Sequence, residues 1–135
     1  MRIVSAFLAN HVEVQNSKVF AHGAFPENWV VAEIPNAVIV GVGVVVEIEP
    51  SELGTPLTLD LVIRPVDGPE LVSAHVGFQR VADDAHLANT PYYMPLAWNI
   101  PVNLTVEGPH EVALTSDDFT LDIIRFGVRL PATPL

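Results

Sequence analysis

The feature that most constrains the fold is the apolar run AVIVGVGVVVEI at residues 37–48. The run is too short to cross a bilayer as a helix, which takes about 20 residues. Its glycines, Gly41 and Gly43, do not form a phosphate loop, because Val46 stands where the third glycine of a dinucleotide fingerprint belongs and no helix start follows. A continuous apolar run with a proline just beyond each end predicts a strand that is covered on both faces.

The two faces of this strand predict different neighbours. Side chains alternate along a strand, so one face should fill the core; it carries Val38, Val40, Val42, Val44, Val46 and Ile48. The other face is small and apolar where a lone domain would be polar, and it carries Ala37, Ile39, Gly41, Gly43, Val45 and then Glu47. We therefore expect another chain, or a loop of this one, to cover the face from Ile39 to Val45.

Other segments also alternate with the period of a strand. Residues 57–64 and 71–80 do so on either side of Asp67-Gly68, which predicts a hairpin. Residues 92–106 are apolar at every even position, with Pro95 and Pro101 at odd ones. Because proline cannot donate to a ladder, this segment should lie at a sheet edge or break near Pro101. We expect a strand to about residue 100, followed by a loop or short strand that crosses to another sheet.

The C-terminal part completes an all-β pattern. After a turn at Ser116-Asp117-Asp118, the apolar parity switches within residues 119–130, which predicts a bulge. The tail, residues 131–135, should be loosely held. A helix is expected only as one turn at residues 50–54. The fold class predicted is a single domain, residues 1–135, built as an antiparallel two-sheet β-sandwich of about eight strands, jelly-roll or immunoglobulin-like.

Composition excludes several partners. Sixteen acidic residues against six basic ones give a net charge of −10, and Lys18 is the single lysine. No basic stripe exists for nucleic acid, and an anionic membrane would repel the chain. Without cysteine there is no disulfide, thiolate metal site or cysteine nucleophile. The apolar run at residues 3–9 is too short for a secretory signal and reads as the first strand. We expect a cytoplasmic protein, or a virion component, with no cofactor.

One loop carries the best polar cluster for a metal. Asp83, Asp84 and His86 lie between two predicted strands, and carboxylates with imidazole can bind a divalent cation. A tight site needs further ligands, so these residues are weak candidates. The alternative is a solvated loop whose aspartates cap turns. The other histidines show no catalytic spacing. A small hydrolase or metal-dependent enzyme is nevertheless one of three hypotheses for the function of this chain.

Two aromatic residues suggest a partner-binding patch. Phe25 and Trp29 flank Pro26-Glu27-Asn28 where a loop leads into a strand, and an exposed aromatic pair binds proteins well. With Ile39 and Val45 they form the candidate partner-binding set. The function we expect is a non-enzymatic protein-interaction module of a bacterial cell, acting through a protein partner or self-association. The alternative is a structural subunit of a larger assembly such as a phage particle.

Several turn and core segments resemble a known family. They are the turn QNSK, the strand VFAHGAF with its glycine, the one-turn PSELG and the late hairpin EGPHEVALTSDD. With these, the chain resembles an uncharacterised, mainly actinobacterial family of short β-sandwich proteins, a domain of unknown function. Two features depart from the family pattern: Gly108-Pro109-His110 replaces a glycine followed by an aromatic residue, and Asn10 replaces an acidic residue. The resemblance implies a sandwich fold and assigns no activity or functional residue.

Overall fold

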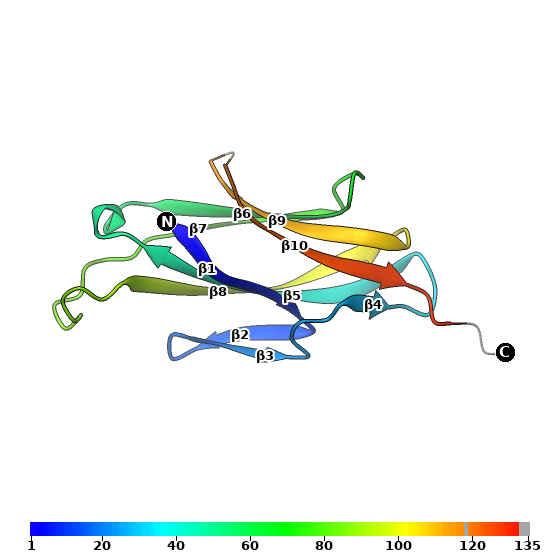
Figure 1. The fold of residues 1–135 in the computed structure, drawn as a ribbon, viewed down its shortest axis with the longest axis horizontal. Coiled ribbons are helices and arrows are strands. Elements are labelled where there is room, and N and C mark those ends of the chain that lie inside the picture. Colours follow the sequence, from blue (N-terminus) through cyan, green and yellow to red (C-terminus); the bar gives the residue numbers. More distant parts are fainter. Residues whose placement is uncertain (118, 133–135) are drawn as a thin grey trace.

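The computed structural model describes residues 1–117 and 119–132, and strands dominate that part of the chain (Figure 1). One 3-10 turn, η1 (Pro50–Glu52), falls within the single turn expected at residues 50–54. The strands are β1 (Arg2–Ala9), β2 (His11–Gln15), β3 (Lys18–His22), β4 (Asn28–Val30), β5 (Asn36–Ile48), β6 (Leu57–Pro65), β7 (Val72–Phe78), β8 (Tyr92–Leu104), β9 (Gly108–Ser116) and β10 (Phe119–Arg129).

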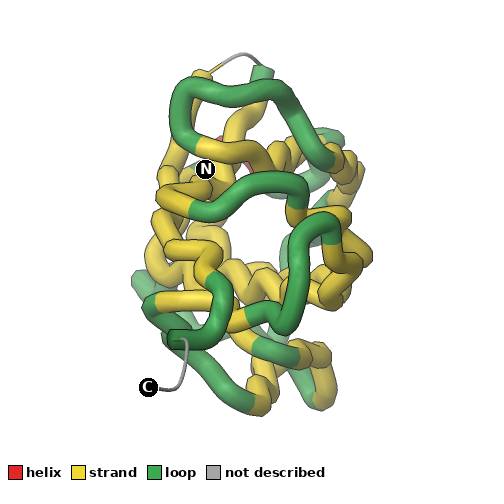
Figure 2. Tube along the Cα trace, turned by 90° about the vertical axis from the view of Figure 1, so that its right-hand side faces the viewer, coloured by secondary structure: helices red, strands yellow, loops and turns green. Residues whose placement is uncertain are grey.

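The described strands form three sheets. One has three strands in the order β1-β5-β8, one has five in the order β4-β10-β9-β6-β7, and the hairpin β2-β3 is separate. Neighbouring strands are antiparallel except β4, which runs parallel to β10 through Asn28–Val30. The view along the long axis shows strand segments arranged around the core (Figure 2). Asp118 of the predicted turn and the end of the predicted tail, residues 133–135, lie outside the described residues.

The core lies between the three-stranded and the five-stranded sheet. Its buried side chains come from both, with Val42 and Val44 of β5 facing the same cluster as Leu61 of β6 and Leu114 of β9. The inward face predicted for β5 is confirmed: the side chains from Val40 to Val46 at even positions are fully buried. The alternation predicted for β6 and β7 is confirmed too, as is their hairpin at Asp67-Gly68.

The hairpin β2-β3 adds a partial third layer. Its two-residue turn uses Asn16 and Ser17, both at positive φ, which matches the twist of antiparallel strands. The Asn99 side chain on β8 accepts a hydrogen bond from Val12 N (2.9 Å) and donates one to Val12 O (2.7 Å). Val12 is fully buried. These contacts attach the hairpin to the three-stranded sheet, on the face away from the core.

Strand β8 differs from the prediction in one respect. It continues unbroken past Pro101 to Leu104 and stays beside β5 along its whole length, so the expected break and crossover near residue 100 are wrong. The edge position predicted from the prolines is confirmed, since β8 ends the three-stranded sheet. An edge strand tolerates Pro95 and Pro101 because a missing N–H that faces away from the ladder breaks no hydrogen bond.

The predicted bulge in the last strand is present. The pairing of β10 with β9 shifts register between Thr120 and Asp122, so Leu121 is the extra residue, and Phe126 and Val128 then face the core. The all-β class is therefore confirmed, but the strands form three sheets and exceed eight within the described residues. The additional elements are the separate hairpin and the short β4. No helix in the described part of the chain is long and apolar enough to cross a membrane.

Candidate interaction surface

The face of β5 that looks away from the core is covered by this chain itself. A Cβ on Gly43 would lie 2.5 Å from the tip of the Phe7 ring, and a Cβ on Gly41 would lie 2.8 Å from the Ala9 carbonyl oxygen. Both glycines are buried although they face outward. Of the two covers that the sequence left open, the structure shows a segment of the same chain over these two positions: Phe7 and the start of the hairpin.

An aromatic pair lies where this cover ends. The Phe25 ring is 5.5 Å from the Phe7 ring, centroid to centroid, and tilted by 36°. Phe7 is half-buried over Gly43, whereas Phe25 is 76% exposed. A phenylalanine this exposed contributes little to the stability of the fold, because the stabilisation is proportional to the apolar area removed from water. Phe25 is the most exposed large hydrophobic side chain in the described part of the chain.

The backbone of Phe25 is held in an unusual conformation. Its φ is +59°, in the left-handed region that large side chains rarely adopt. Its N–H donates a 2.8 Å hydrogen bond to the Leu8 carbonyl at the free edge of β1. A non-glycine residue in this region costs on the order of 1 kcal/mol or more. The fold thus presents an apolar ring to solvent despite a conformational cost, which is typical of functional positions.

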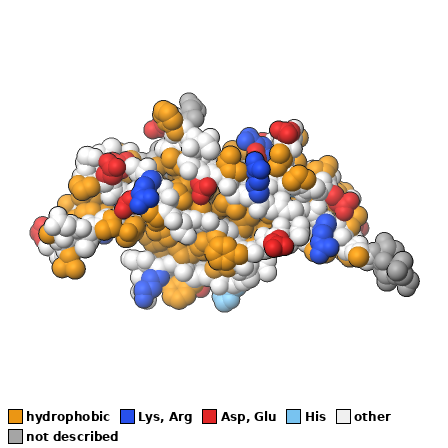
Figure 3. Space-filling view, viewed as in Figure 1, with side chains coloured by type: hydrophobic (Ala, Val, Ile, Leu, Met, Phe, Trp, Pro, Cys, Tyr) orange, Lys and Arg blue, Asp and Glu red, His pale blue; other side chains and the backbone are white. Residues whose placement is uncertain are grey.

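A small cleft opens beside this aromatic pair, between the edges of β1 and β10. It has a volume of about 210 Å³ and is mainly apolar, with one acidic and one basic side chain; the lining is Ala6, Phe7, Leu8, Phe25, Pro26, Glu27, Ile124 and Arg125. Figure 3 shows hydrophobic side chains in a band across the middle of this face, with charged ones scattered around them. We refer to this lining as the aromatic cleft.

One predicted partner-binding residue is misplaced. Trp29 was expected near the surface beside Phe25, but it is 8% exposed and belongs to the core. Its ring meets the edge of Phe126 with 5.2 Å between centroids. The reason is the parallel pairing of β4 with β10, which sets Trp29 opposite Val128 on the inward face. The partner of Phe25 is Phe7, a residue that the sequence reading placed only within the first strand.

The other two predicted residues lie on the outer face of β5. Ile39 is 49% exposed beyond the covered glycines, and Val45 is half-buried on the other side of them. Val45 stands opposite Ser5 of β1, two pairs from Phe7 and Gly43. Val45 therefore lies on the same side as the aromatic cleft, and Ile39 is separated from it by the positions that the hairpin start covers.

The loop candidate for metal binding is organised by its own hydrogen bonds. Asp83 accepts one from Ala85 N at 2.9 Å and caps a turn, and Asp84 is exposed. The His86 ring stacks on Tyr92 with 3.7 Å between centroids, and its Nε2 lies 2.9 Å from Thr90 O. Among residues 1–117 and 119–132, no three His, Asp or Glu side chains gather as a metal site would require. The geometry fits the alternative of a capped surface loop.

A histidine–aspartate pair lies on the outer face of the five-stranded sheet. His75 Nδ1 is 2.5 Å from Asp60 Oδ1, and the two residues are directly opposed on β7 and β6. Both side chains are largely exposed, beside a shallow hollow of about 440 Å³ that Ser73 and Thr115 also line. The carboxylate orients the imidazole as a catalytic base would be oriented. Sequence could have found this pair, because the Asp67-Gly68 turn fixes the register that opposes them.

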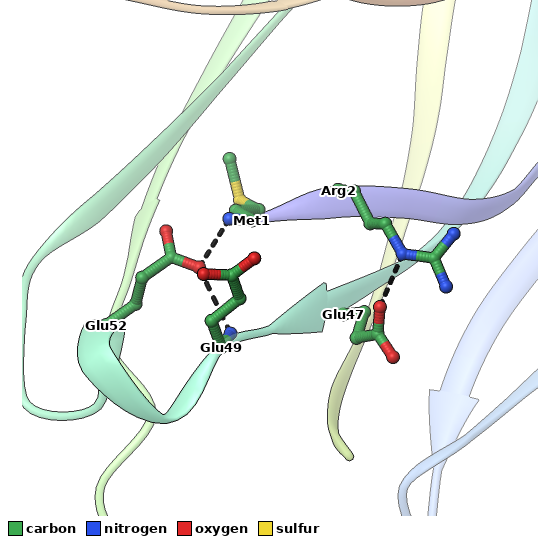
Figure 4. Close-up of polar contacts among 5 residues, drawn as sticks. All are labelled: Met1, Arg2, Glu47, Glu49 and Glu52. Atoms are coloured by element: carbon green, nitrogen blue, oxygen red, sulfur yellow. Dashed lines mark hydrogen bonds and ion pairs between the residues drawn. The ribbon is translucent and has the colours of Figure 1, made fainter.

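The chain start is tied to the end of β5 by carboxylates (Figure 4). The Met1 ammonium donates to Glu52 Oε1, and Arg2 Nε donates to Glu47 Oε2 at 2.5 Å. Glu49 N also donates to Glu52 at 3.1 Å. Partial burial of Glu52 opposes its ionisation, but the two hydrogen bonds and the ammonium charge outweigh it. They hold the pKa of Glu52 below its ordinary value.

Comparison with known proteins does not assign a function to this chain. No protein-family model matches this chain, and no curated protein matches it. Function is therefore inferred from three features of the surface. They are an exposed aromatic residue held at positive φ, a small apolar cleft at a strand edge, and an acidic exterior.

Proposed function

We propose that this chain is a protein-interaction module whose partner docks an apolar side chain in the aromatic cleft. The observation that carries the proposal is Phe25, exposed by three quarters, in a strained backbone conformation, and packed on Phe7. Aromatic side chains beside a pocket are the usual anchors of protein interfaces. Val45, on the same side, extends the apolar surface toward β5, and Ile39 forms a separate contact beyond the hairpin.

The surroundings of the cleft favour a protein over a small substrate. Its volume, about 210 Å³, suits one side chain and lies below the range of pockets that enclose small ligands. It lies between β1 and β10, where a side chain that protrudes from a partner can enter it. With a net charge of −10, the molecule attracts a partner that is basic around its docking segment.

The proposal also covers the detailed sheet architecture and the family of the chain. We interpret the three-stranded and five-stranded sheets as a two-sheet β-sandwich of the jelly-roll or immunoglobulin type, with the hairpin β2-β3 added outside. The shared core cluster supports that interpretation. Membership of the actinobacterial sandwich family is also part of the proposal, on the strength of the turn segments QNSK and PSELG. A cytoplasmic location is proposed with it.

The test is a comparison of two matched substitutions. Phe25→Ala removes the aromatic ring of the cleft, and Phe119→Ala removes an equally exposed ring (75%) at the start of β10. Lysate of the source cells is passed over immobilised wild-type protein and each variant, and the retained proteins are quantified by mass spectrometry. We expect a protein that wild type and Phe119→Ala retain equally and Phe25→Ala loses at least tenfold.

Two further measurements make that comparison decisive. Purified partner is titrated against all three proteins, and their unfolding midpoints in urea are compared to show that each variant is folded. A partner that binds all three with the same Kd would remove the aromatic cleft as the site. Retention of no specific protein by wild type would contradict the interaction module itself.

A structural subunit of a larger assembly is the second candidate. It is favoured by exposed apolar side chains outside the cleft. Four of them are more than half exposed: Val30, Val81, Leu87 and Phe119. Apolar surface on several sides suits a subunit with several neighbours, as in a phage particle. Native mass measurement separates the two candidates, because an assembly subunit forms large defined oligomers and a module binds its partner as a small species.

A further inference from the structure

Strand β7 (Val72–Phe78) ends the five-stranded sheet and has β6 as its neighbour on one side. Its ladder with β6 runs without a register shift from Leu57–Phe78 to Ile63–Val72. The backbone N–H and C=O groups on its other side form a straight row at the sheet edge. Such a row is a template for pairing with another strand.

The remaining edges of the two larger sheets carry features that oppose strand pairing. The β8 edge contains Pro95 and Pro101, which remove two donors. The β1 edge is bulged at Val4, and Phe25 N already occupies the Leu8 carbonyl. The edge strand β4 is three residues long, and β10 beside it is bulged at Leu121. Prolines, bulges and short edges are the devices by which proteins avoid edge-to-edge association.

Strand β7 has none of these devices. Its sequence VSAHVGF contains no proline and no Lys, Arg, Asp or Glu. Its inward side chains are only partly buried although they pack against the core: Val72, Ala74, Val76 and Phe78. Across the opening, the partly buried Met94, Leu96 and Trp98 of β8 show the same incomplete burial. The core is thus open on the side where a further strand beside β7 would cover it.

We propose that β7 pairs antiparallel with β7 of a second copy of this chain, so that the two five-stranded sheets form one continuous sheet. The register with full overlap places His75 on the two-fold axis, opposite His75 of the second copy. Ala74 then faces Val76, and Val72 faces Phe78, on the side toward the two cores. Every inward apolar residue meets an apolar one, which is the self-complementarity that a two-fold interface requires.

Charge does not oppose a second copy at β7. The chain carries −10, so two copies repel each other wherever their acidic surfaces meet. Strand β7 contributes no carboxylate. Of the two carboxylates in the hollow beside its outer face, Asp60 is hydrogen-bonded to His75, and Glu70 lies before the strand begins. The inference concerns β7 alone and does not depend on partner binding at the aromatic cleft, so each can fail without the other.

The absence of cysteine allows a direct test of the register. In His75→Cys, the introduced thiols stand opposite each other across the two-fold axis, with Cα atoms about 4.5–5.5 Å apart, inside the range that a disulfide spans. In Ser73→Cys, the same pairing leaves the thiols four residues apart along the strands, at roughly 13 Å, where no disulfide forms. Both positions are exposed on the same strand and face, so they are matched.

We expect mild oxidation to convert most of His75→Cys, and little of Ser73→Cys, to a covalent dimer of twice the chain mass. Sedimentation equilibrium of the unmodified protein over a concentration series should show the same dimer. A protein that stays monomeric at every concentration overturns the proposal, as does equal cross-linking of the two variants. Efficient cross-linking of Ser73→Cys alone overturns the full-overlap register.

A charge on the inward side of the edge gives an independent test. Val76→Lys places an ammonium at the half-buried edge, where its long side chain reaches solvent in the monomer and meets apolar groups in the dimer. Val14→Lys makes the same exchange at a 41% exposed position in the hairpin. We expect Val76→Lys to be folded by circular dichroism and at least tenfold weaker in dimerisation, and Val14→Lys to dimerise as the unmodified protein does. Equal dimerisation of both variants overturns the proposal.

Discussion

The two faces of β5 are both apolar, yet they are covered in different ways. The inner face meets a whole sheet, and Val42 and Val44 are fully buried in a core cluster fed by both large sheets. The outer face meets one phenylalanine ring and the start of a hairpin, which press on Gly43 and Gly41. The inner face therefore depends on many interchangeable contacts, and the outer face depends on a few specific ones.

The difference shows how one strand can specify two layers. On the inner face, burial of each valine contributes roughly 1.5–3 kcal/mol, and neighbouring side chains share the loss when one is changed. On the outer face, glycine is needed because backbone and ring approach too closely for a Cβ. The four predictions that follow test this contrast, from the largest expected effect to the smallest.

The largest contrast is expected between adjacent valines. Val44→Asp places a carboxylate on the fully buried face, where an unpaired charge should cost more than about 4 kcal/mol and prevent stable folding. Val45→Asp places the same group on the half-buried outer face, with an expected cost of about 1 kcal/mol. Urea unfolding measures both. Similar losses in the two variants would show that the outer face is as closed as the inner one.

The two glycines should differ from each other. In Gly41→Ala the new methyl group meets the backbone oxygen of Ala9, which cannot move alone, so about 3 kcal/mol should be lost. In Gly43→Ala it meets the tip of the Phe7 ring, a side chain that can rotate, so the loss should be about 1 kcal/mol. Thermal unfolding compares them. A larger loss for Gly43→Ala would mean that Phe7 is held more rigidly than the β1 backbone.

The hairpin should loosen when its polar attachment is removed. Asn99→Ala leaves N and O of buried Val12 without the two Asn99 hydrogen bonds, at an expected cost of about 2 kcal/mol. Amide exchange in β2 and β3 should then accelerate, while exchange in the inner part of β5 changes little. Asn103→Ala, four residues further along β8 and exposed, serves as the control. Equal acceleration throughout β5 would contradict a separately attached layer.

The smallest effect is expected at Glu52, in the turn that follows β5. The folded pKa of Glu52 is held below its ordinary value of 4.5, so its ionised form stabilises the protein above that pH. This contribution is lost as the pH falls through the lower folded pKa. Glu52→Gln should cost about 1 kcal/mol at pH 7 and nothing in strong acid. Glu33→Gln, which removes an exposed carboxylate, serves as the control.

The inner architecture could be predicted because it follows from local alternation. The buried even positions of β5, the Asp67-Gly68 hairpin and the bulge of β10 are each encoded within a dozen residues. The all-β class follows from the same patterns. The β8 break was wrongly predicted at Pro101, because sequence alone does not show that the proline nitrogen faces the free edge, where the strand can continue past it.

The outer layer could not be predicted because its contacts are distant in sequence. Val12 and Asn99 are 87 residues apart, and nothing in either local pattern joins them. Trp29 was misplaced for the same reason, since a three-residue strand pairs it with the far end of the chain. Phe25 was expected at the surface and is exposed, but its contact with Phe7 could not be predicted, because it forms only when β1 lies beside β5 and the Phe7 ring covers Gly43.

The weak attachment of the hairpin β2-β3 also affects the dynamics of the molecule. Its own ladder joins residues close in sequence, from His11–His22 to Gln15–Lys18, so it can form quickly and as a unit. Its attachment by Asn99 and one buried valine costs far less to break than the core. Lifting of the hairpin should therefore occur more often than global unfolding, and each event should admit water to Gly41, which the start of the hairpin covers.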